Sequence, residues 1–146
     1  MTKSASVVID AGLGVFQVIA DPLSHQIDAL WSDWIREGVV VCAPRLWLNE
    51  TTSVLHKIFM QNLISKERAL EALEALLGLS VELYEADTET CRQAFAWASR
   101  LGQHQAYDGF YLALAVKLSA LFWTTDQRLV NRARQLGIDW VNWIGA

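Results

Sequence analysis

The chain has 146 residues, of which 53% are hydrophobic and 19% are charged, and it carries a formal net charge of −4 at pH 7. The many apolar side chains exclude a disordered polypeptide, and the length suits one domain that covers residues 1–146. The acidic balance excludes a general affinity for phosphate, so any binding of nucleic acid has to come from a local surface.

The sequence predicts no membrane-spanning segment and no secretory signal. The longest apolar stretch, residues 113–123, is interrupted by Lys117 and Ser119 and is shorter than the roughly 20 residues that a spanning helix needs. The first apolar segment ends at Asp10, which is too early and too acidic for a signal peptide. We therefore expect a cytoplasmic protein with no membrane partner.

Short β-rich runs alternate with helical patterns along the chain. Strands are predicted at residues 6–9, 39–42, 81–84, 121–124 and 138–143. Helices are predicted from Asp21-Pro22 to Gly38, from Pro44 to about Gln61, from Ser65 to Gly78, from Asp87 to near Gly102, over 107–118 and over 127–136. Strands that alternate with helices form βαβ units. The predicted fold class is therefore α/β in three layers, with a mostly parallel central sheet between two layers of helices.

The sequence contains two cysteines, Cys42 and Cys91. Each lies in an apolar segment and has no His or second Cys at the spacing of a metal site. We predict that both are buried thiols.

Three aspartates stand where a parallel sheet binds ligands or where a helix begins. Asp10 follows the predicted strand at 6–9, Asp126 stands just after the strand at 121–124, and Asp108 opens an apolar helical run. Ligands bind beyond the carboxyl ends of parallel strands, which makes the first two candidates for a site. Asp is also a favoured helix cap, and capping alone explains each of the three when it is considered singly.

Glu50 stands on an apolar face of its predicted helix. Residues spaced by four along that helix are Leu46, Glu50, Val54 and Ile58. No Lys or Arg lies three or four residues from Glu50, and burial of an unpaired carboxylate is costly. The carboxylate then reaches water through its flexible stem, finds a cationic partner in another element, or faces a bound cation.

Four acids gathered in one place point to a divalent metal ion. Mg²⁺ and Mn²⁺ prefer oxygen ligands, and Mg²⁺ typically joins a few carboxylates to substrate phosphates. Without a cation, like charges a few ångströms apart repel and raise one another's pKa. Such repulsion argues against a cluster with a purely structural role.

Four segments, in this order along the chain, carry a resemblance to a known family. They are Val7-Val8-Ile9-Asp10, Glu50 in the helix after the second strand, Tyr107-Asp108 before Tyr111-Leu112-Ala113-Leu114-Ala115, and Thr124-Thr125-Asp126-Gln127-Arg128-Leu129. Over nearly its whole length the chain resembles PIN-domain proteins, specifically VapC-type toxin ribonucleases of type II toxin–antitoxin systems. The Tyr-Asp pair before an apolar helix is fairly specific to that family, whereas a lone strand-terminal Asp is not.

The resemblance implies a PIN-like fold and a metal-dependent endoribonuclease that cuts single-stranded RNA. In that family four acids close around Mg²⁺ or Mn²⁺, which makes Asp10, Glu50, Asp108 and Asp126 the expected metal ligands and catalytic residues. Thr124 matches a position whose hydroxyl often supports the site. The resemblance also implies a homodimer and a small antitoxin protein that blocks the acidic pocket.

The sequence departs from the family in one place. After the first Asp the family often has Ser, Thr or Asn within two residues, whereas this chain has Ala11-Gly12. We therefore expect a supporting hydrogen bond to be missing, which affects fine geometry more than metal binding itself.

Arg128 and Arg132 are candidates for binding RNA. They are spaced by four residues in the helix after Asp126 and would share one face of it, pointing towards substrate phosphates. A solvated helix face explains the same spacing.

Two other functions stay open. A catalytically degenerate PIN-like scaffold would keep the fold and act through protein binding. A phosphoacceptor signalling domain also places acids at strand ends, but it would typically have an adjacent acidic pair after the first strand and a Lys after a late one. This chain has neither feature.

Overall fold

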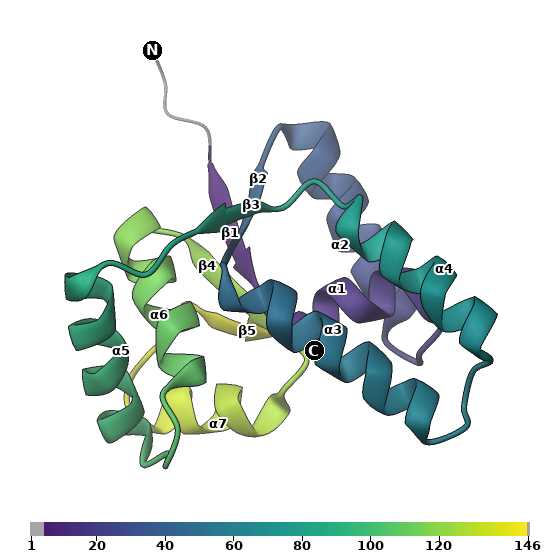
Figure 1. Cartoon of the computed structure of the whole chain (residues 1–146). Coiled ribbons are helices and arrows are strands. Elements are labelled where there is room, and N and C mark those ends of the chain that lie inside the picture. Colours follow the sequence, from purple (N-terminus) through teal and green to yellow (C-terminus); the bar gives the residue numbers. More distant parts are fainter. Residues whose placement is uncertain (1–4, 146) are drawn as a thin grey trace.

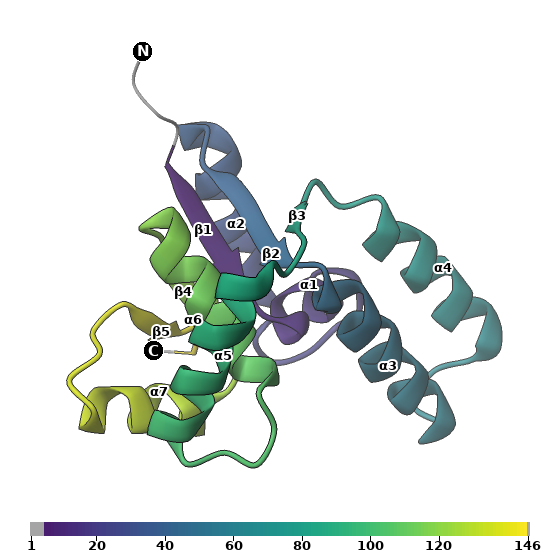
Figure 2. The same cartoon turned by 60° about the vertical axis from the view of Figure 1, so that its left-hand side comes forward.

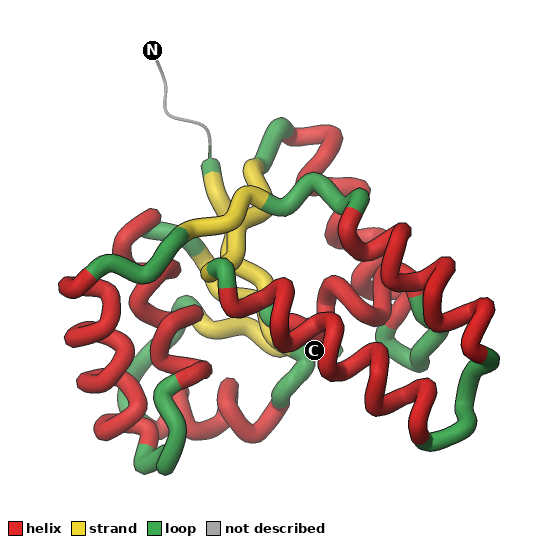
Figure 3. Tube along the Cα trace, in the orientation of Figure 1, coloured by secondary structure: helices red, strands yellow, loops and turns green. Residues whose placement is uncertain are grey.

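A computed structural model describes residues 5–145 and contains, within that range, one all-parallel sheet of five strands (Figures 1 and 3). The strands are β1 Ser6–Ile9, β2 Val40–Pro44, β3 Glu82–Tyr84, β4 Leu121–Thr124 and β5 Val141–Trp143. Their spatial order is β3-β2-β1-β4-β5. The predicted α/β class is confirmed. The single-domain prediction also covered residues 1–4 and 146, which lie outside the described residues.

Helices cover both faces of this sheet. They are α1 Ala11–Val18, α2 Ser24–Glu37, α3 Leu46–Met60, α4 Lys66–Leu77, α5 Thr88–Leu101, α6 Tyr107–Leu118 and α7 Gln127–Gln135. Helix α6 lies against β1, β2 and β4 and packs along α5, while α2 contacts β2 from the opposite face (Figures 1 and 2). Helices α3 and α4 contact each other and α1, and they extend away from the sheet (Figure 2).

The order of the strands reverses at β1. The chain passes from β1 to β2 and β3 on one side, then returns through α5 and α6 to β4 and β5 on the other side. In a parallel sheet such a reversal opens a crevice beyond the carboxyl ends of the two adjacent strands whose connections leave in opposite directions, here the paired strands β1 and β4. The order also differs from the β2-β1-β3-β4-β5 order of flavodoxin-like signalling domains. The phosphoacceptor alternative is therefore wrong at the level of fold.

The central strands are buried on both sides, which explains their uninterrupted apolar sequence. Val8 and Ile9 of β1 and Phe122 of β4 are fully buried. Within the same core, the ring of Tyr111 from α6 stacks on Phe122 with 5.5 Å between centroids. This packing fixes α6 against the two strands whose ends form the crevice.

Two helices begin later than predicted. Pro44 ends β2, where it is in register with Tyr84 of β3, and α3 starts at Leu46. Asp21 and Pro22 form a turn instead of the first turn of α2, which starts at Ser24. The Asp21 carboxylate accepts a hydrogen bond from the Leu23 N–H within that turn. Pairing and local turn chemistry therefore outweigh the favoured capping sequence at both places.

Helix α1 was not predicted. Its sequence contains Gly12 and Gly14 and two β-branched residues, Val15 and Val18, which lower helix propensity. The helix forms because Asp10 caps its amino terminus and because Leu13 and Val15 are buried. Tertiary packing supplies what local propensity lacks.

The predictions for the cysteines and for membrane segments have different outcomes. Cys42 is buried as expected, but Cys91 is exposed in the first turn of α5, although its spacing of three and seven residues places it on the same side of that helix as the buried residues Ala94 and Ala98. Neither the helical spacing of Cys91 nor its apolar neighbours in the sequence reveal this exposure. Within the described residues no helix is both long and apolar enough to cross a bilayer.

Gly109 allows α5 and α6 to approach closely. A Cβ at this position would lie 2.2 Å from the backbone oxygen of Ala94. We predict that Gly109→Ala lowers the free energy of unfolding by about 1–3 kcal/mol, although alanine favours helix, because the clash is with backbone that has to shift. Urea denaturation measures this change.

Gly78→Ala is the matched control. A Cβ at residue 78 would meet its nearest atoms at 3.5 Å, and the backbone there has an ordinary helical conformation. This variant should unfold within about 0.5 kcal/mol of the wild type. Equal stability of the Gly109 and Gly78 variants would contradict the predicted close approach.

Candidate functional site

Asp10 lies at the carboxyl end of β1, and all of its polar atoms are engaged. Its backbone N–H donates to the carbonyl of Trp123, and its carbonyl accepts from Nε1 of the buried Trp47 at 2.9 Å. Oδ1 accepts from the Leu13 N–H at 3.0 Å, so Asp10 caps α1, in agreement with the preference of Asp for helix caps. Oδ2 accepts from Thr124 and Thr125. The side chain is therefore held in one orientation.

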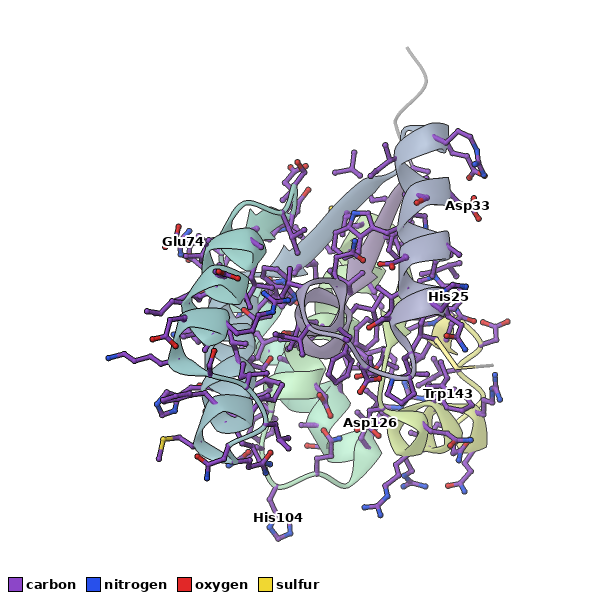
Figure 4. The ribbon with its side chains drawn as sticks, turned by 90° about the vertical axis from the view of Figure 1, so that its right-hand side faces the viewer. His25, Asp33, Glu74, His104, Asp126 and Trp143 are labelled. Carbon is purple, nitrogen blue, oxygen red and sulfur yellow. The ribbon has the colours of Figure 1, made fainter. Side chains whose placement is uncertain are left out.

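Thr124 connects Asp10 with Asp126. Its buried hydroxyl donates to Asp10 Oδ2 at 2.6 Å and accepts from the Asp126 N–H at 3.0 Å. Asp126 caps α7, because its Oδ1 accepts from the N–H groups of Arg128 and Leu129. Asp10 and Asp126 thus each cap a helix and also lie at the carboxyl end of a central strand. Figure 4 shows Asp126 at the start of α7.

Thr125 supplies the hydroxyl that the sequence lacks after Asp10. Its Oγ1 lies 3.2 Å from Asp10 Oδ2, and its N–H donates to the same oxygen at 2.9 Å. Gly12 makes room for it, since a Cβ at that position would lie 2.1 Å from Thr125 Oγ1. The expectation of a missing hydrogen bond is therefore wrong, because the donor comes from the end of β4 instead of α1.

Glu50 finds a neutral partner on α6. The hydroxyl of Tyr111 donates to Glu50 Oε1 at 2.6 Å across a sequence separation of 61 residues. Tyr111 is only 2% exposed, and burial together with the nearby acids raises the pKa of its hydroxyl far above the ordinary value. It therefore remains a protonated donor that holds the Glu50 carboxylate at the crevice.

Asp108 lies in the first turn of α6 and does not cap it. The residue at the cap position is Ala106, which offers no side-chain hydrogen bond. Asp108 Oδ2 instead accepts from Nε2 of Gln103 at 2.7 Å. The helical start predicted at Tyr107 is confirmed, and the carboxylate is left to face the crevice.

The four acids influence one another's charge. Burial raises the pKa of Asp10 above its ordinary value, although its hydrogen bonds act in the opposite direction. Burial also raises the pKa of Glu50, and the charges of Asp108 and Asp10 raise it further. Burial likewise raises the pKa of Asp108, with a further contribution from Asp126. The fold thus brings the four predicted acids into one electrostatic cluster.

The chemistry of this cluster fits a divalent cation, but the side chains do not form a closed cage. Among the described residues, Glu50 Oε2, Asp108 Oδ1 and Asp126 Oδ2 have no hydrogen-bond donor. Such free carboxylate oxygens are the ligands that Mg²⁺ and Mn²⁺ prefer. Within residues 5–145, no three or more His, Cys, Asp or Glu side chains are arranged to hold an ion as they stand. Binding of an ion to these acids would therefore require side-chain movement.

The two arginines predicted to bind RNA have different surroundings. Arg128 is exposed, and its side chain makes no hydrogen bond with any described residue. Arg132 points its guanidinium at the carboxyl end of α5, donating to the carbonyls of Leu101 and Arg100 at 3.4 and 3.5 Å. Part of its hydrogen-bonding capacity is therefore used inside the protein.

Sequence reasoning missed the residues that orient the acids. These residues are Trp47, Gln103, Tyr111 and Thr125. Thr125 and Tyr111 carried a signal, since each lies in a segment on which the family resemblance rests. The other contacts depend on how distant helices pack, and no local pattern predicts them.

Comparison with known proteins points to one family. A family model described as PIN domain matches residues 15–139, a range that includes Glu50, Asp108 and Asp126 and begins after Asp10. A comparison with curated proteins finds no match.

Several solved structures have the same fold. VapC20 of Mycobacterium tuberculosis, a sarcin-ricin loop cleaving toxin, is 16% identical with a TM-score of 0.61, covering 82% of this chain and 87% of that one. VapBC2 of Rickettsia felis, bound to a DNA fragment from its promoter, is 12% identical with a TM-score of 0.67, covering 94% and 98%. FitAcB of Neisseria gonorrhoeae is 16% identical with a TM-score of 0.61, covering 93% and 96%. At these identities the likeness establishes the fold.

Gly12 and Thr125 should be energetically coupled. We predict that Gly12→Ala lowers the free energy of unfolding by about 1–3 kcal/mol, because the new Cβ meets the Thr125 side chain. In a Thr125→Ala background the same substitution should cost at least about 1 kcal/mol less, because most of the clash is removed. Urea denaturation of the four proteins measures the coupling, and additive effects would contradict it.

The clustered charges should make the metal-free chain less stable at neutral pH. The pKa of Asp108 is raised on folding, so its stabilising contribution is complete below the unfolded pKa and is lost as the pH rises through the folded pKa. We predict that Asp108→Asn raises the melting temperature by about 3 °C or more near neutral pH with chelator. The gain should shrink towards about pH 4, where the wild-type carboxyl becomes protonated.

Divalent metal provides the control for this prediction. Added Mn²⁺ should stabilise the wild type more than the Asp108→Asn variant, because a ligand that binds only the folded state raises its stability. Thermal melts with chelator and with Mn²⁺ compare the two. An Asn variant that melts below the wild type in chelator at neutral pH would refute the predicted charge penalty.

Proposed function

Because the chain belongs to the PIN-domain family, we propose that it is a metal-dependent endoribonuclease that cuts single-stranded RNA, with Asp10, Glu50, Asp108 and Asp126 as its catalytic acids. The observation that carries this proposal is the gathering of four acids near the carboxyl ends of β1 and β4, where three of them keep a carboxylate oxygen without a hydrogen-bond donor among the described residues. Burial, and to a smaller extent the neighbouring acids, raise the pKa values of Glu50 and Asp108 there. Such an arrangement costs stability unless a cation offsets it. Helix capping accounts for the places of Asp10 and Asp126 but not for those of Glu50 and Asp108.

Mg²⁺ or Mn²⁺ would be held by the free oxygens of Glu50, Asp108 and Asp126, with Asp10 beside them. When bound, such an ion supplies an activated water at near-neutral pH and charge stabilisation for the phosphate. The identity and number of ions are part of the proposal.

The chain's own residues orient the acids, and their hydrogen bonds favour the charged forms against the effect of burial. Tyr111 donates to Glu50 from the core, which lowers the pKa of that carboxyl against the effect of burial. Gln103 fixes one oxygen of Asp108 and leaves the other free. Thr124 and Thr125 hold Asp10 from the end of β4. The expected contribution of these neighbours is precise placement of charge before the substrate arrives.

RNA binding has to overcome the acidity of the site. Arg128, exposed at the start of α7 and next but one to Asp126, is the better candidate for a phosphate contact. Arg132 is the weaker candidate, because α5 already accepts its hydrogen bonds. Bound metal would reverse the local charge and reduce the repulsion.

We further propose that the chain is the toxin of a toxin–antitoxin pair, acts as a homodimer and is inhibited by a small antitoxin protein. This proposal is supported by the proteins that share the fold, which include a cleaving toxin and toxin–antitoxin complexes. The rival proposal, a degenerate scaffold that only binds protein, predicts no cleavage under any condition.

We predict that the purified chain cuts single-stranded RNA with Mg²⁺ or Mn²⁺ and not with chelator. Asp10→Asn and Asp108→Asn should each lower kcat by about 100-fold or more, because each removes charge that acts on the reacting phosphate. Gel analysis of a labelled RNA of defined sequence measures the rates. The fragment ends should carry 5′-phosphate and 3′-hydroxyl groups.

Asp28→Asn serves as the matched control, since Asp28 is an exposed acid on α2. It should keep the wild-type rate. Absence of cleavage by the antitoxin-free wild type with either metal would favour the scaffold. In cells, growth arrest on expression that Asp10→Asn relieves would support the toxin, whereas arrest that persists in this variant would contradict a catalytic cause.

A further inference from the structure

Tyr107 stands where three hollows of the surface meet. The first, of about 450 Å³, is bordered by Glu50, Asp108 and Gln103. The second, of about 570 Å³, is bordered by Glu50 and Asn49. Tyr107 borders both of these and also the third hollow. Its side chain is 53% exposed although it is large and aromatic.

The third hollow, of about 350 Å³, is bordered by none of the four acids. Its walls are largely apolar and include Leu46, Tyr84, Phe110 and Leu114, with Tyr107 at the border. The second and third hollows also share Leu46 and Asn49, and the first two share Glu50. The three hollows therefore adjoin one another, from the acid cluster to an apolar wall, and are together called the groove below.

Charge in this groove does not favour phosphate contacts. Glu50 and Asp108 are acidic, and Arg45 of the third hollow is paired with Glu85 at 3.2 Å. No Lys borders any of the three hollows among the described residues. His104 borders the first hollow but projects outward at the tip of its loop (Figure 4). A ligand in this groove has to gain its affinity from apolar and aromatic contacts and from side-chain amides.

We propose that Tyr107 is a stacking platform for an unpaired base of the nucleic-acid strand whose phosphate lies at the acid cluster. This inference rests on the proposed nuclease function and deepens it. Single-stranded nucleic acid exposes the flat apolar faces of its bases, and these stack on aromatic side chains largely without regard to sequence. The neighbouring apolar wall receives the next base along the strand, and a duplex, whose bases stay stacked on each other, cannot use either surface.

The position of Tyr107 supports a role in positioning substrate. It is the first residue of α6 and precedes Asp108 directly, so its ring is fixed to the same helical turn as one of the proposed metal ligands. Tyr111, one turn further on, holds Glu50. A base stacked on Tyr107 would therefore be placed in a fixed relation to two of the acids.

The test uses three variants of the full chain and a short single-stranded RNA. Tyr107→Leu removes the ring, Tyr107→Phe keeps the ring and removes the hydroxyl, and Phe95→Leu removes an even more exposed aromatic that borders none of the three hollows. Fluorescence anisotropy with chelator measures Kd for the RNA without cleavage. Cleavage kinetics with Mn²⁺ measure KM and kcat separately, and thermal melts confirm that each variant is folded.

Tyr107→Leu should weaken binding and raise KM by about 5- to 100-fold, the effect of losing one stacked base, with kcat within about threefold of the wild type. Tyr107→Phe and Phe95→Leu should bind within about threefold of the wild type. Moving an abasic nucleotide along the RNA should find one position that weakens the wild type as much as Tyr107→Leu does, and that position should not weaken the variant further.

Three results would overturn the inference. Wild-type Kd and KM in Tyr107→Leu would show that the ring is not used, and an equal loss in Tyr107→Phe would assign the effect to the hydroxyl. Wild-type RNA affinity combined with lost inhibition by a partner protein would make the groove a protein-docking surface. If the wild type cuts no RNA with either metal, the nuclease proposal fails, and the Kd comparison still decides whether Tyr107 binds a base.

Discussion

Negative charge is held partly out of water at the carboxyl ends of β1 and β4, and the surrounding structure is built around that charge. Asp10 receives hydrogen bonds from α1, from Trp47 of α3 and from the end of β4. Each contact ties a separate element to the end of β1. Helix α1, whose glycines make it a weak helix by itself, begins at the carboxylate that it helps to satisfy. The hydrogen bonds to Asp10 therefore both join these elements and fix the orientation of its carboxylate.

A second link joins the two halves of the sheet. Tyr111 is anchored in the core by Phe122 and reaches Glu50 on α3, so α6 and α3 are joined across the crevice by one short hydrogen bond. Burial restricts the movement of these side chains and also raises the free energy that is needed to ionise each carboxyl group. The remaining apolar core has to supply the free energy that these ionised acids cost. Active sites commonly show this trade-off, in which folding stability is lost so that charged groups are already in place for function.

The sequence revealed the acids better than it revealed their neighbours. Asp10 and Asp126 follow buried strands, a position that parallel sheets use for ligands, and Glu50 stood out as a carboxylate without a partner on its own helix. All of these signals are local. The partner of Glu50 lies 61 residues away, and its identity depends on the packing of two helices against different strands. For the same reason the class and most element boundaries were predictable, while α1 and the exposure of Cys91 were not.

The exchange between Gly12 and Thr125 has a consequence for how such proteins change over time. One small space beside Asp10 accepts a side chain from α1 or from the end of β4, but not from both, since a Cβ at residue 12 would lie 2.1 Å from Thr125 Oγ1. In this chain a side chain at residue 12 crowds Thr125, and loss of the Thr125 side chain leaves the space empty. The effect of a substitution at one position therefore depends on the residue at the other, so we expect epistasis between the two positions. A search pattern that demands a hydroxyl soon after the first Asp would pass over this chain, although Thr125 supplies a hydroxyl to the same carboxylate.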